Sequence, residues 1–323
     1  MLEINQTRRL AWALPFWSVF SVAAFGTEEP VPKPAVETAP SENNPIFRFD
    51  RNGTTTVPVA LIQDSIYVQL QVNGQALWFL LDSGSSFMLI DRETAKAMSL
   101  SFKGGRAIQG AGAGKVQIDY VVEDLALQLP GLEMSGYKFS AVGLQSIADN
   151  IGHKEEGLLG YDFLKSFVVS VNYDAKTLTI TDPRFFKAPA KGTVVPIGFQ
   201  GKWPILHARI AVPGNAPVDS EFVIDSGSGD AVDHPLIKQS TGKVTKTTSD
   251  ATSLGEPVTG YLGPIDWLEI GPYKMRNLPT FCCGGAEKAI GGAILRRFKI
   301  TFDYGHERMF FEPGAHFKDP FTR

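Results

Sequence analysis

One six-residue pattern occurs twice in the chain, as Leu80-Leu81-Asp82-Ser83-Gly84-Ser85 and as Val223-Ile224-Asp225-Ser226-Gly227-Ser228. A single Asp-Ser-Gly triplet is ordinary turn chemistry. Two copies, however, present two carboxyl groups on matching loops. A water-activating acid/base pair needs such groups, because one must be ionised to accept a proton while the other donates one. Asp82 and Asp225 are therefore the first candidates for chemistry.

The residues before each copy predict a pair of strands. Apolar residues recur at every second position, at Ile66, Val68, Leu70 and Val72 before the first copy and at Leu206, Ala208, Ile210 and Val212 before the second. This period is typical of half-buried strands, with Tyr67, Gln69 and Gln71 on the other face of the first. Turn residues follow at 73–74 and 213–214, and residues 77–81 and 221–224 lead into each Asp.

The residues after each copy also correspond. Asp91 precedes residues 92–98, which read as a short helix capped by that Asp, and Asp233 precedes His234-Pro235, another helix-start signal. Further on, residues 158–167 match residues 289–298 without a gap, at a constant offset of 131 positions, and the match continues into residues 171–173 and 302–304. Such a repeat predicts two similar lobes related by an approximate two-fold axis, which would bring Asp82 and Asp225 face to face.

With these motifs in place, the chain resembles the pepsin/retropepsin superfamily of aspartic proteases in its single-chain form. The family signature combines each Asp-Ser-Gly-Ser loop with a later apolar-apolar-Gly segment, here Leu158-Leu159-Gly160 and Ala289-Ile290-Gly291. The resemblance spans roughly Thr55 to Pro313. It implies a mainly β, two-lobed acid-protease fold, in which two pseudo-two-fold-related β-barrel-like lobes carry short helices.

The chain departs from pepsin at two places. Phe87-Met88-Leu89 follows the first Asp loop where pepsins usually have a Trp, and residues 109–114, which are rich in Gly, stand where the flap hairpin should carry a Tyr. Each lobe is therefore closer to a retropepsin subunit. Gly110, Ala111 and Gly112 are candidates for the tip of a mobile flap that closes over substrate. An ordinary flexible hairpin tip is the alternative.

The resemblance also implies roles for the site residues. Asp82 and Asp225 would hold and activate one water for peptide hydrolysis, as in an aspartic endopeptidase. Ser83 and Ser226 would bond to the backbone of the opposite loop, and Ser85 and Ser228 to the outer carboxylate oxygens; local turn bonding is the alternative for all four. Gly84 and Gly227 would let backbone N–H groups point at the carboxylates, while Gly160 and Gly291 would let a strand pass close to each Asp loop.

Composition and charge exclude several other classes. The chain is 43% hydrophobic with a net charge of −3, and no Lys/Arg run suggests nucleic acid. Its five histidines lack metal-ligand spacing, so we expect neither a metal nor a cofactor. A glycosidase would not require duplicated Asp-Ser-Gly loops. The alternative to a protease is a non-catalytic protein on the same scaffold that binds a peptide or a protein partner.

The amino end predicts export. Arg8-Arg9 precede an apolar stretch from Leu10 to Phe25, and small residues follow, as in a cleavable signal peptide. We therefore expect a signal peptide at 1–26, a disordered Pro/Glu-rich linker at 27–45, an N-terminal lobe at 46–190 and a C-terminal lobe at 191–323. The expected location is periplasmic or extracellular, with membrane attachment only if the amino-terminal segment stays uncleaved. Because one chain supplies both Asp loops, a monomer is expected.

Overall fold

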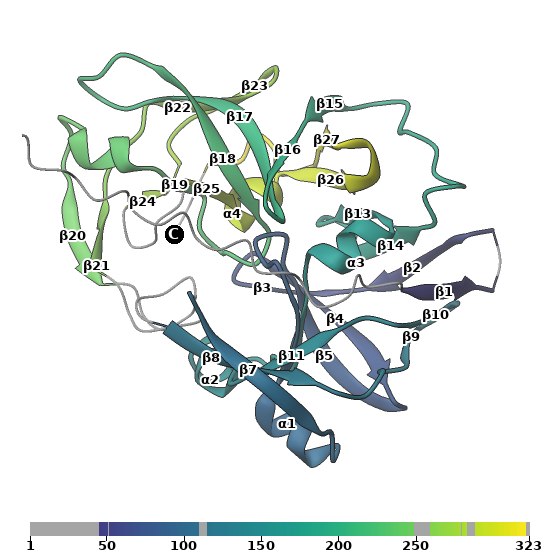
Figure 1. Cartoon of the computed structure of the whole chain (residues 1–323). Coiled ribbons are helices and arrows are strands. Elements are labelled where there is room, and N and C mark those ends of the chain that lie inside the picture. The colour runs from purple at the N-terminus through teal and green to yellow at the C-terminus, as the bar shows by residue number, and fades with distance from the viewer. Residues whose placement is uncertain are drawn as a thin grey trace, which may run out of the picture. The chain divides into compact units, whose positions relative to one another are not determined.

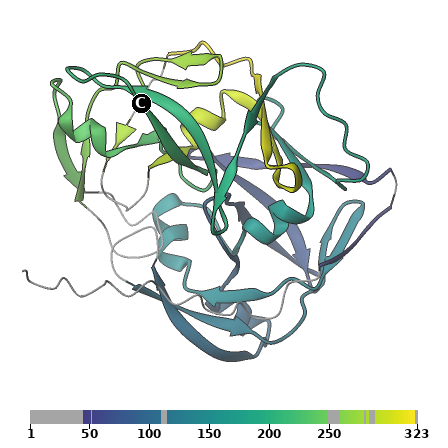
Figure 2. The ribbon, with the colours of Figure 1, turned by 45° about the horizontal axis from the view of Figure 1, so that its top comes forward.

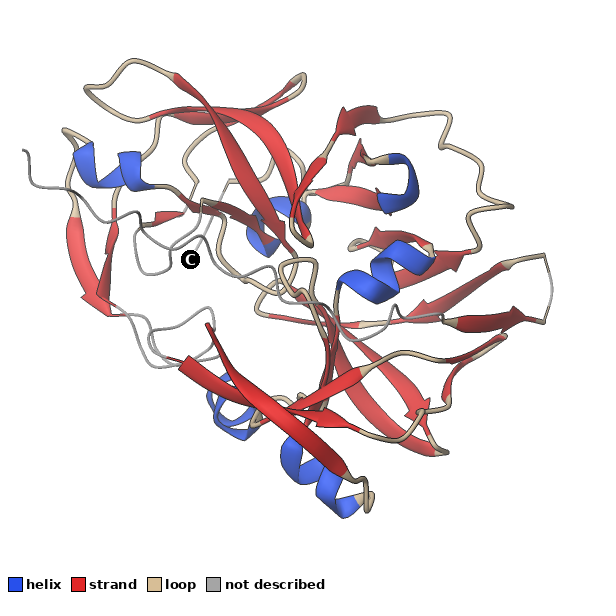
Figure 3. Ribbon diagram, in the orientation of Figure 1, coloured by secondary structure: helices blue, strands red, loops and turns tan. Residues whose placement is uncertain are grey.

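Strands make up most of the regular structure, and the few helices are short (Figure 3). The computed structural model describes residues 45–50, 52–109, 115–248, 259–278, 280–282 and 288–320. The predicted signal peptide and nearly all of the predicted linker lie outside these residues. Within them, no helix is long and apolar enough to cross a membrane. The expectation of a mainly β protein is confirmed.

An 11-stranded sheet is built from residues 46–159 in the order β1-β10-β9-β4-β5-β12-β6-β11-β8-β7, with β3 paired to β4. Its strands are β1 (Ile46–Phe49), β3 (Ala60–Ile62), β4 (Ser65–Val72), β5 (Gln75–Leu81), β6 (Met88–Asp91), β7 (Phe102–Gln109), β8 (Lys115–Val121), β9 (Leu127–Leu129), β10 (Leu132–Ser135), β11 (Phe139–Val142) and β12 (Gly157–Leu159). In Figures 1 and 2 these strands, coloured purple to teal, lie mostly in the lower half of the picture.

The predicted hairpin ahead of Asp82 is formed by β4 and β5. Asn73 and Gly74 both take positive φ, 50° and 80°, which suits a two-residue turn between twisted strands. Leu70, Phe79 and Leu81 pack into the main core on one face. Tyr67 lies on the other face, as the alternation predicts, but this face is also covered, and Tyr67 is buried there in a second apolar cluster with Leu80.

An 8-stranded sheet repeats this arrangement around Asp225. Its order is β23-β22-β17-β18-β25-β19-β24, with β16 paired to β17. The strands are β16 (Gly198–Gln200), β17 (Trp203–Ala211), β18 (Val218–Asp225), β19 (Val232–Asp233), β22 (Trp267–Ile270), β23 (Tyr273–Met275), β24 (Thr280–Phe281) and β25 (Ala289–Gly291); β20 (Thr245–Thr248) and β21 (Thr259–Leu262) pair separately. The series β17-β18-β25-β19-β24 has the same parallel and antiparallel pairings as β4-β5-β12-β6-β11.

A six-stranded sheet combines strands from both halves of the sequence. Its order is β15-β27-β26-β13-β14-β2, made of β15 (Thr193–Pro196), β27 (Arg308–Pro313), β26 (Phe298–Asp303), β13 (Val168–Asn172), β14 (Thr177–Thr181) and β2 (Thr54–Pro58). At its centre Ser170 pairs with Thr301, and their hydroxyl oxygens are 2.7 Å apart. These two residues are separated by the 131 positions of the sequence repeat, so the repeat's equivalent strands pair with each other.

The helices are α1 (Arg92–Ala97), α2 (Gln145–Ile151), α3 (Tyr161–Ser166) and α4 (Gly292–Leu295), with 3-10 turns η1 (Pro235–Gln239) and η2 (Tyr304–His306). The Asp91-capped helix is confirmed, because Asp91 Oδ2 accepts the Thr94 N–H at 2.9 Å. The second helix start yields a 3-10 turn whose cap is His234, with Nδ1 accepting the Leu236 N–H at 3.1 Å.

Candidate active site

The two Asp-Ser-Gly loops face each other. β5 delivers Asp82 and β18 delivers Asp225, and both residues remain partly exposed. A Cβ added to Gly84 would lie 2.7 Å from Cγ of Asp225, and one added to Gly227 would lie 2.6 Å from Cγ of Asp82. The two carboxyl groups are close enough that the charge of Asp225 raises the pKa of Asp82. Glycine is therefore required at both positions because each loop passes against the opposite carboxyl group.

Ser83 and Ser226 join the loops by reciprocal hydrogen bonds. Ser83 Oγ donates to the carbonyl of Ile224 at 2.6 Å and accepts the Ser226 N–H at 2.9 Å. Ser226 Oγ donates to the carbonyl of Leu81 at 2.8 Å and accepts the Ser83 N–H at 3.0 Å. Both serines are fully buried. Four hydrogen bonds thus fix the distance between the loops that carry the aspartates.

The backbone supplies donors to both carboxylates, but unequally. Gly84 N–H donates to Asp82 Oδ1 at 2.8 Å. Asp225 Oδ1 accepts two such bonds, from Gly227 at 3.0 Å and from Ser228 at 3.1 Å. Asp225 is therefore the better-solvated anion of the two.

The hydroxyls of Ser85 and Ser228 differ from their expected role. Ser85 Oγ accepts the Phe87 N–H at 3.2 Å and donates to the Phe87 carbonyl at 3.1 Å, and Ser228 Oγ accepts the Asp230 N–H at 3.2 Å. Each hydroxyl thus bonds to the backbone of the residue two positions later, which is the usual local bond of a serine in a turn. Ser228 reaches the carboxylate through its backbone N–H instead.

The pKa shifts of Asp82 and Asp225 differ in the same sense as their backbone donors. Burial raises the pKa of Asp82 well above its ordinary value, the charge of Asp225 raises it further, and the Gly84 N–H opposes both. Burial also raises the pKa of Asp225, but the N–H groups of Gly227 and Ser228 and the bond from Asp82 lower it. In the coupled pair a shared proton therefore favours Asp82.

Gly160 and Gly291 lie where a helix start passes beneath each Asp loop. A Cβ on Gly160 would be 2.7 Å from the Ser85 carbonyl oxygen, and one on Gly291 would be 3.0 Å from that of Ser228. The next residue of each segment donates its N–H to the same carbonyl, at 2.9 Å and 2.7 Å. Both glycines therefore allow the close approach that supports the loops.

Residues 68–163 match the family model described as aspartyl protease. The match includes Asp82, Ser83, Gly84 and Gly160, and it supports assignment to an aspartyl protease family and a peptidase activity. The second Asp loop lies beyond the matched residues. No curated protein matches the chain.

Sequence reasoning missed two neighbours of the aspartyl protease motif. Tyr67 donates its hydroxyl to Glu155 Oε2 at 2.8 Å, and both side chains are buried. The charge of Glu155 contributes to the raised pKa of Asp82, so this carboxyl lies within electrostatic range of the pair. The acidic pair Glu155-Glu156, separated by Gly157 from the Leu-Leu-Gly segment, was the available signal, but the partner of Glu155 is 88 positions away in the chain.

The predicted flap residues, Gly110, Ala111 and Gly112, lie outside the described residues. The strands that lead to them, β7 and β8, are paired in a hairpin from Phe102 to Val121. Ile108, Val116 and Ile118 of this hairpin pack with the apolar cluster around Tyr67 and Leu80. The hairpin thus packs on the sheet face that carries Tyr67 and Leu80.

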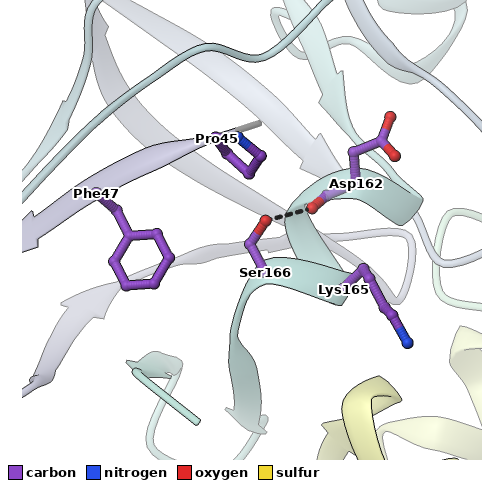
Figure 4. Close-up of a pocket in the computed structure, with 5 residues that line it drawn as sticks. All are labelled: Pro45, Phe47, Asp162, Lys165 and Ser166. Carbon is purple, nitrogen blue, oxygen red and sulfur yellow. Dashed lines mark hydrogen bonds between the residues drawn. The ribbon is translucent and has the colours of Figure 1, made fainter. Parts of the chain in front are cut away.

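Two pockets occur away from the aspartates. One is lined by Pro45, Phe47, Asp162, Lys165 and Ser166, where Ser166 Oγ donates to the Asp162 carbonyl at 2.7 Å (Figure 4). The other lies beside Asp64 and Tyr173. Neither includes Asp82 or Asp225. In the described residues no three His, Cys, Asp or Glu side chains cluster as metal ligands would.

Proposed function

We propose that the protein is an aspartic endopeptidase that hydrolyses peptide bonds with a water activated by Asp82 and Asp225. The observation that carries this proposal is the position of each Asp carboxyl group against the glycine of the opposite loop, with the two loops cross-linked by Ser83 and Ser226. Two such groups cannot both ionise cheaply, so they share one proton, as the paired carboxyls of aspartic proteases do. The match to an aspartyl protease family supports the same assignment.

The donor pattern gives each Asp a role in this mechanism. Asp225, stabilised as the anion by two backbone N–H groups, takes a proton from the water as it attacks the peptide carbonyl carbon. Asp82 donates its proton to the carbonyl oxygen, which yields a neutral tetrahedral diol. Collapse of the diol breaks the C–N bond while the leaving nitrogen receives the proton held by Asp225 and a diol hydroxyl returns its proton to Asp82. The pair ends with one proton, as it began.

We also propose that the chain has the two-lobed, pseudo-symmetric fold, with lobes at 46–190 and 191–323. The matching strand orders around Asp82 and Asp225 support this, as does the pairing of Ser170 with Thr301 at the centre of the six-stranded sheet. An approximate two-fold axis would pass between those two residues. Each lobe is proposed to be retropepsin-like.

The proposed setting follows from the amino-terminal sequence. We propose that residues 1–26 direct export and that residues 27–45 form a linker, so that the enzyme works in a periplasmic or extracellular space. Its partner is a peptide or protein substrate. One chain carries both Asp loops, so the proposed enzyme is a monomer.

The test compares Asp82→Asn and Asp225→Asn with the wild type on a denatured-protein digest across pH 3–8. Each substitution removes one partner of the proton relay, so we expect cleavage to fall by about 10³-fold or more. The Tm should stay the same or rise, since Asn removes a carboxyl group whose charged form is disfavoured by desolvation. Asp219→Asn, on an exposed part of β18, is the matched control and should cleave like the wild type.

A folded Asp82→Asn or Asp225→Asn variant with undiminished cleavage would contradict the proposed chemistry. A wild-type protein that binds peptides tightly but turns none over at any pH would instead support the non-catalytic binding alternative. Pepstatin sensitivity is not the deciding measurement, because retropepsin-like enzymes need not bind that inhibitor.

A further inference from the structure

Tyr67 lies on the sheet face that carries Leu80, two residues before Asp82. Tyr67 pairs with Leu80 of β5, and Leu80 pairs with Leu158 of β12, so these three residues form one row across three strands. All three belong to the second apolar cluster rather than the main core. Asp82 directly follows β5, its N–H donates to the carbonyl of Leu159 at the end of β12, and its charge contributes to the raised pKa of Tyr67.

Glu155 is held on this face by Tyr67. Its side chain is only 4% exposed, and its Oε2 accepts the Tyr67 hydroxyl. The neighbouring Glu156 is turned elsewhere, since its Oε2 accepts the Trp78 N–H at 2.8 Å. The Glu156 N–H also donates to the Trp78 carbonyl, at 2.8 Å, which ties the segment to β5. Glu155 forms no ion pair with a basic side chain in the described part of the chain.

A carboxyl group in this environment loses its proton at a higher pH than an exposed one. Burial raises the pKa of Glu155 to about 7, although the Tyr67 hydroxyl stabilises the anion and opposes the rise. When Glu155 is ionised, its charge raises the pKa of Asp82. The interaction is reciprocal, so the three carboxyls titrate as a set.

We propose that Glu155, held by Tyr67, acts on the Asp82/Asp225 pair and keeps it singly protonated to a higher pH than the pair alone would allow. Glu155 is a positioning residue in this proposal, because it acts through the aspartates and touches no substrate. The kinetic consequence rests on the proposed function. Only the singly protonated pair supports the proton relay, so losing the Glu155 charge narrows the working pH range from the alkaline side.

Other titratable groups around Glu155 must stay constant in the test. The His153 ring packs 4.7 Å from the Tyr67 ring and 5.0 Å from that of Trp78. Glu156 and the two aspartates complete the set on the adjoining segments. All are retained in the Glu155 variant, and Glu156 supplies a matched control because Glu156→Gln makes the same chemical change one residue away.

The kinetic test measures kcat/KM against pH for a peptide without ionisable groups near the scissile bond. With Glu155→Gln we expect the alkaline limb to move down by about 0.5 to 1 pH unit, a loss of about three- to tenfold on that limb. Gln can still accept the Tyr67 hydroxyl, which protects the fold. Tyr67→Phe should shift the limb in the same direction by less, because Glu155 then ionises later. Glu156→Gln should leave the limb in place.

A second readout is independent of cleavage. Carboxyl ¹³C NMR on protein labelled at Asp, assigned with Asp82→Asn and Asp225→Asn, reports the two titration steps of the pair. Glu155→Gln should lower the upper step. An unchanged upper step overturns the inference, whether or not peptides are cleaved. A lowered upper step in a protein that cleaves nothing supports the inference while the proposed function fails.

Discussion

At the scale of single residues, Ser83 and Ser226 show how two hydroxyls can join two loops. Each one donates to a carbonyl and accepts an N–H from the opposite loop, with no water required in between. Buried backbone groups that lose such partners cost about 1–3 kcal/mol each. The serines thus contribute to stability as well as to the distance between the aspartates.

Ser83→Ala should therefore lower the free energy of unfolding by about 2–4 kcal/mol, because it leaves the Ser226 N–H and the Ile224 carbonyl without partners. Urea unfolding at neutral pH measures this. Ser85→Ala is the control, since its hydroxyl bonds only within its own loop and is partly exposed, and it should cost less than about 1 kcal/mol. Equal losses in the two variants would contradict the role of Ser83.

The sequence located Asp82, Asp225 and their supporting glycines because their signals are local and duplicated. It did not locate Tyr67 or Glu155, whose environment depends on a contact between distant parts of the chain. Alternation along β4 correctly predicted the face of Tyr67, but a pattern of period two cannot show that this face is itself covered. The catalytic roles of the two aspartates stay predictions.

At the scale of elements, η1 depends on a histidine where a carboxylate would be more usual. His234 is buried, its Nδ1 accepts the Leu236 N–H, and its Nε2 lies 3.1 Å from Ser220 Oγ. Burial lowers the pKa of His234 to about 4, and the nearby charge of Lys288 contributes. A protonated imidazole could not accept the cap bond, so the folded protein holds this residue neutral.

His234 should make folding stability depend on pH. In the unfolded chain a His protonates below about 6.5, whereas the folded protein resists protonation down to about 4. Stability should therefore fall as pH drops from about 6.5 toward 4. His234→Asn, which caps without titrating, should lose less stability over that range in urea unfolding.

The control is His207→Asn, on an exposed part of β17, which should follow the wild type. A wild type and a His234→Asn variant with the same change in stability between pH 6.5 and 4 would contradict this assignment. The sequence predicted a helix start here from Pro235, with Asp233 at the place that corresponds to Asp91, but the capping residue is His234. Asp91 caps α1, but the second segment forms a tighter 3-10 turn whose cap is one residue later.

At the scale of the whole molecule, two hairpin tips each contact residues from the other half of the sequence. The β3–β4 tip places Asp64 Oδ1 3.2 Å from Arg296 Nε, after α4, and Ser65 Oγ donates to the Gly227 carbonyl at 3.1 Å. The β16–β17 tip places Lys202 Nζ 2.9 Å from Asp162 Oδ1, on α3. Neither contact was predicted, since the sequence repeat indicates equivalent segments but not which side chains meet.

Combining Lys202→Ala with Arg296→Ala should destabilise the protein by about 0.4–2 kcal/mol, because partly exposed ion pairs are worth about 0.2–1 kcal/mol each and distant pairs add. The difference from the wild type should shrink in about 1 M salt, where the Debye length is about 3 Å. Lys96→Ala, whose ion pair lies within α1, is the control. A double variant as stable as the wild type at low salt would contradict the expected contribution.

The acidic and basic partners are exchanged between the two crossing contacts. The β3–β4 tip supplies the acidic residue Asp64, which pairs with Arg296. The β16–β17 tip supplies the basic residue Lys202, which pairs with Asp162. Two identical subunits around a true two-fold axis would have to make the same contact twice. Joining both copies in one polypeptide removes that constraint, so each copy is free to specialise. The unequal N–H donors at Asp82 and Asp225 are a second instance of such divergence, since they make the two carboxyl groups electrostatically different.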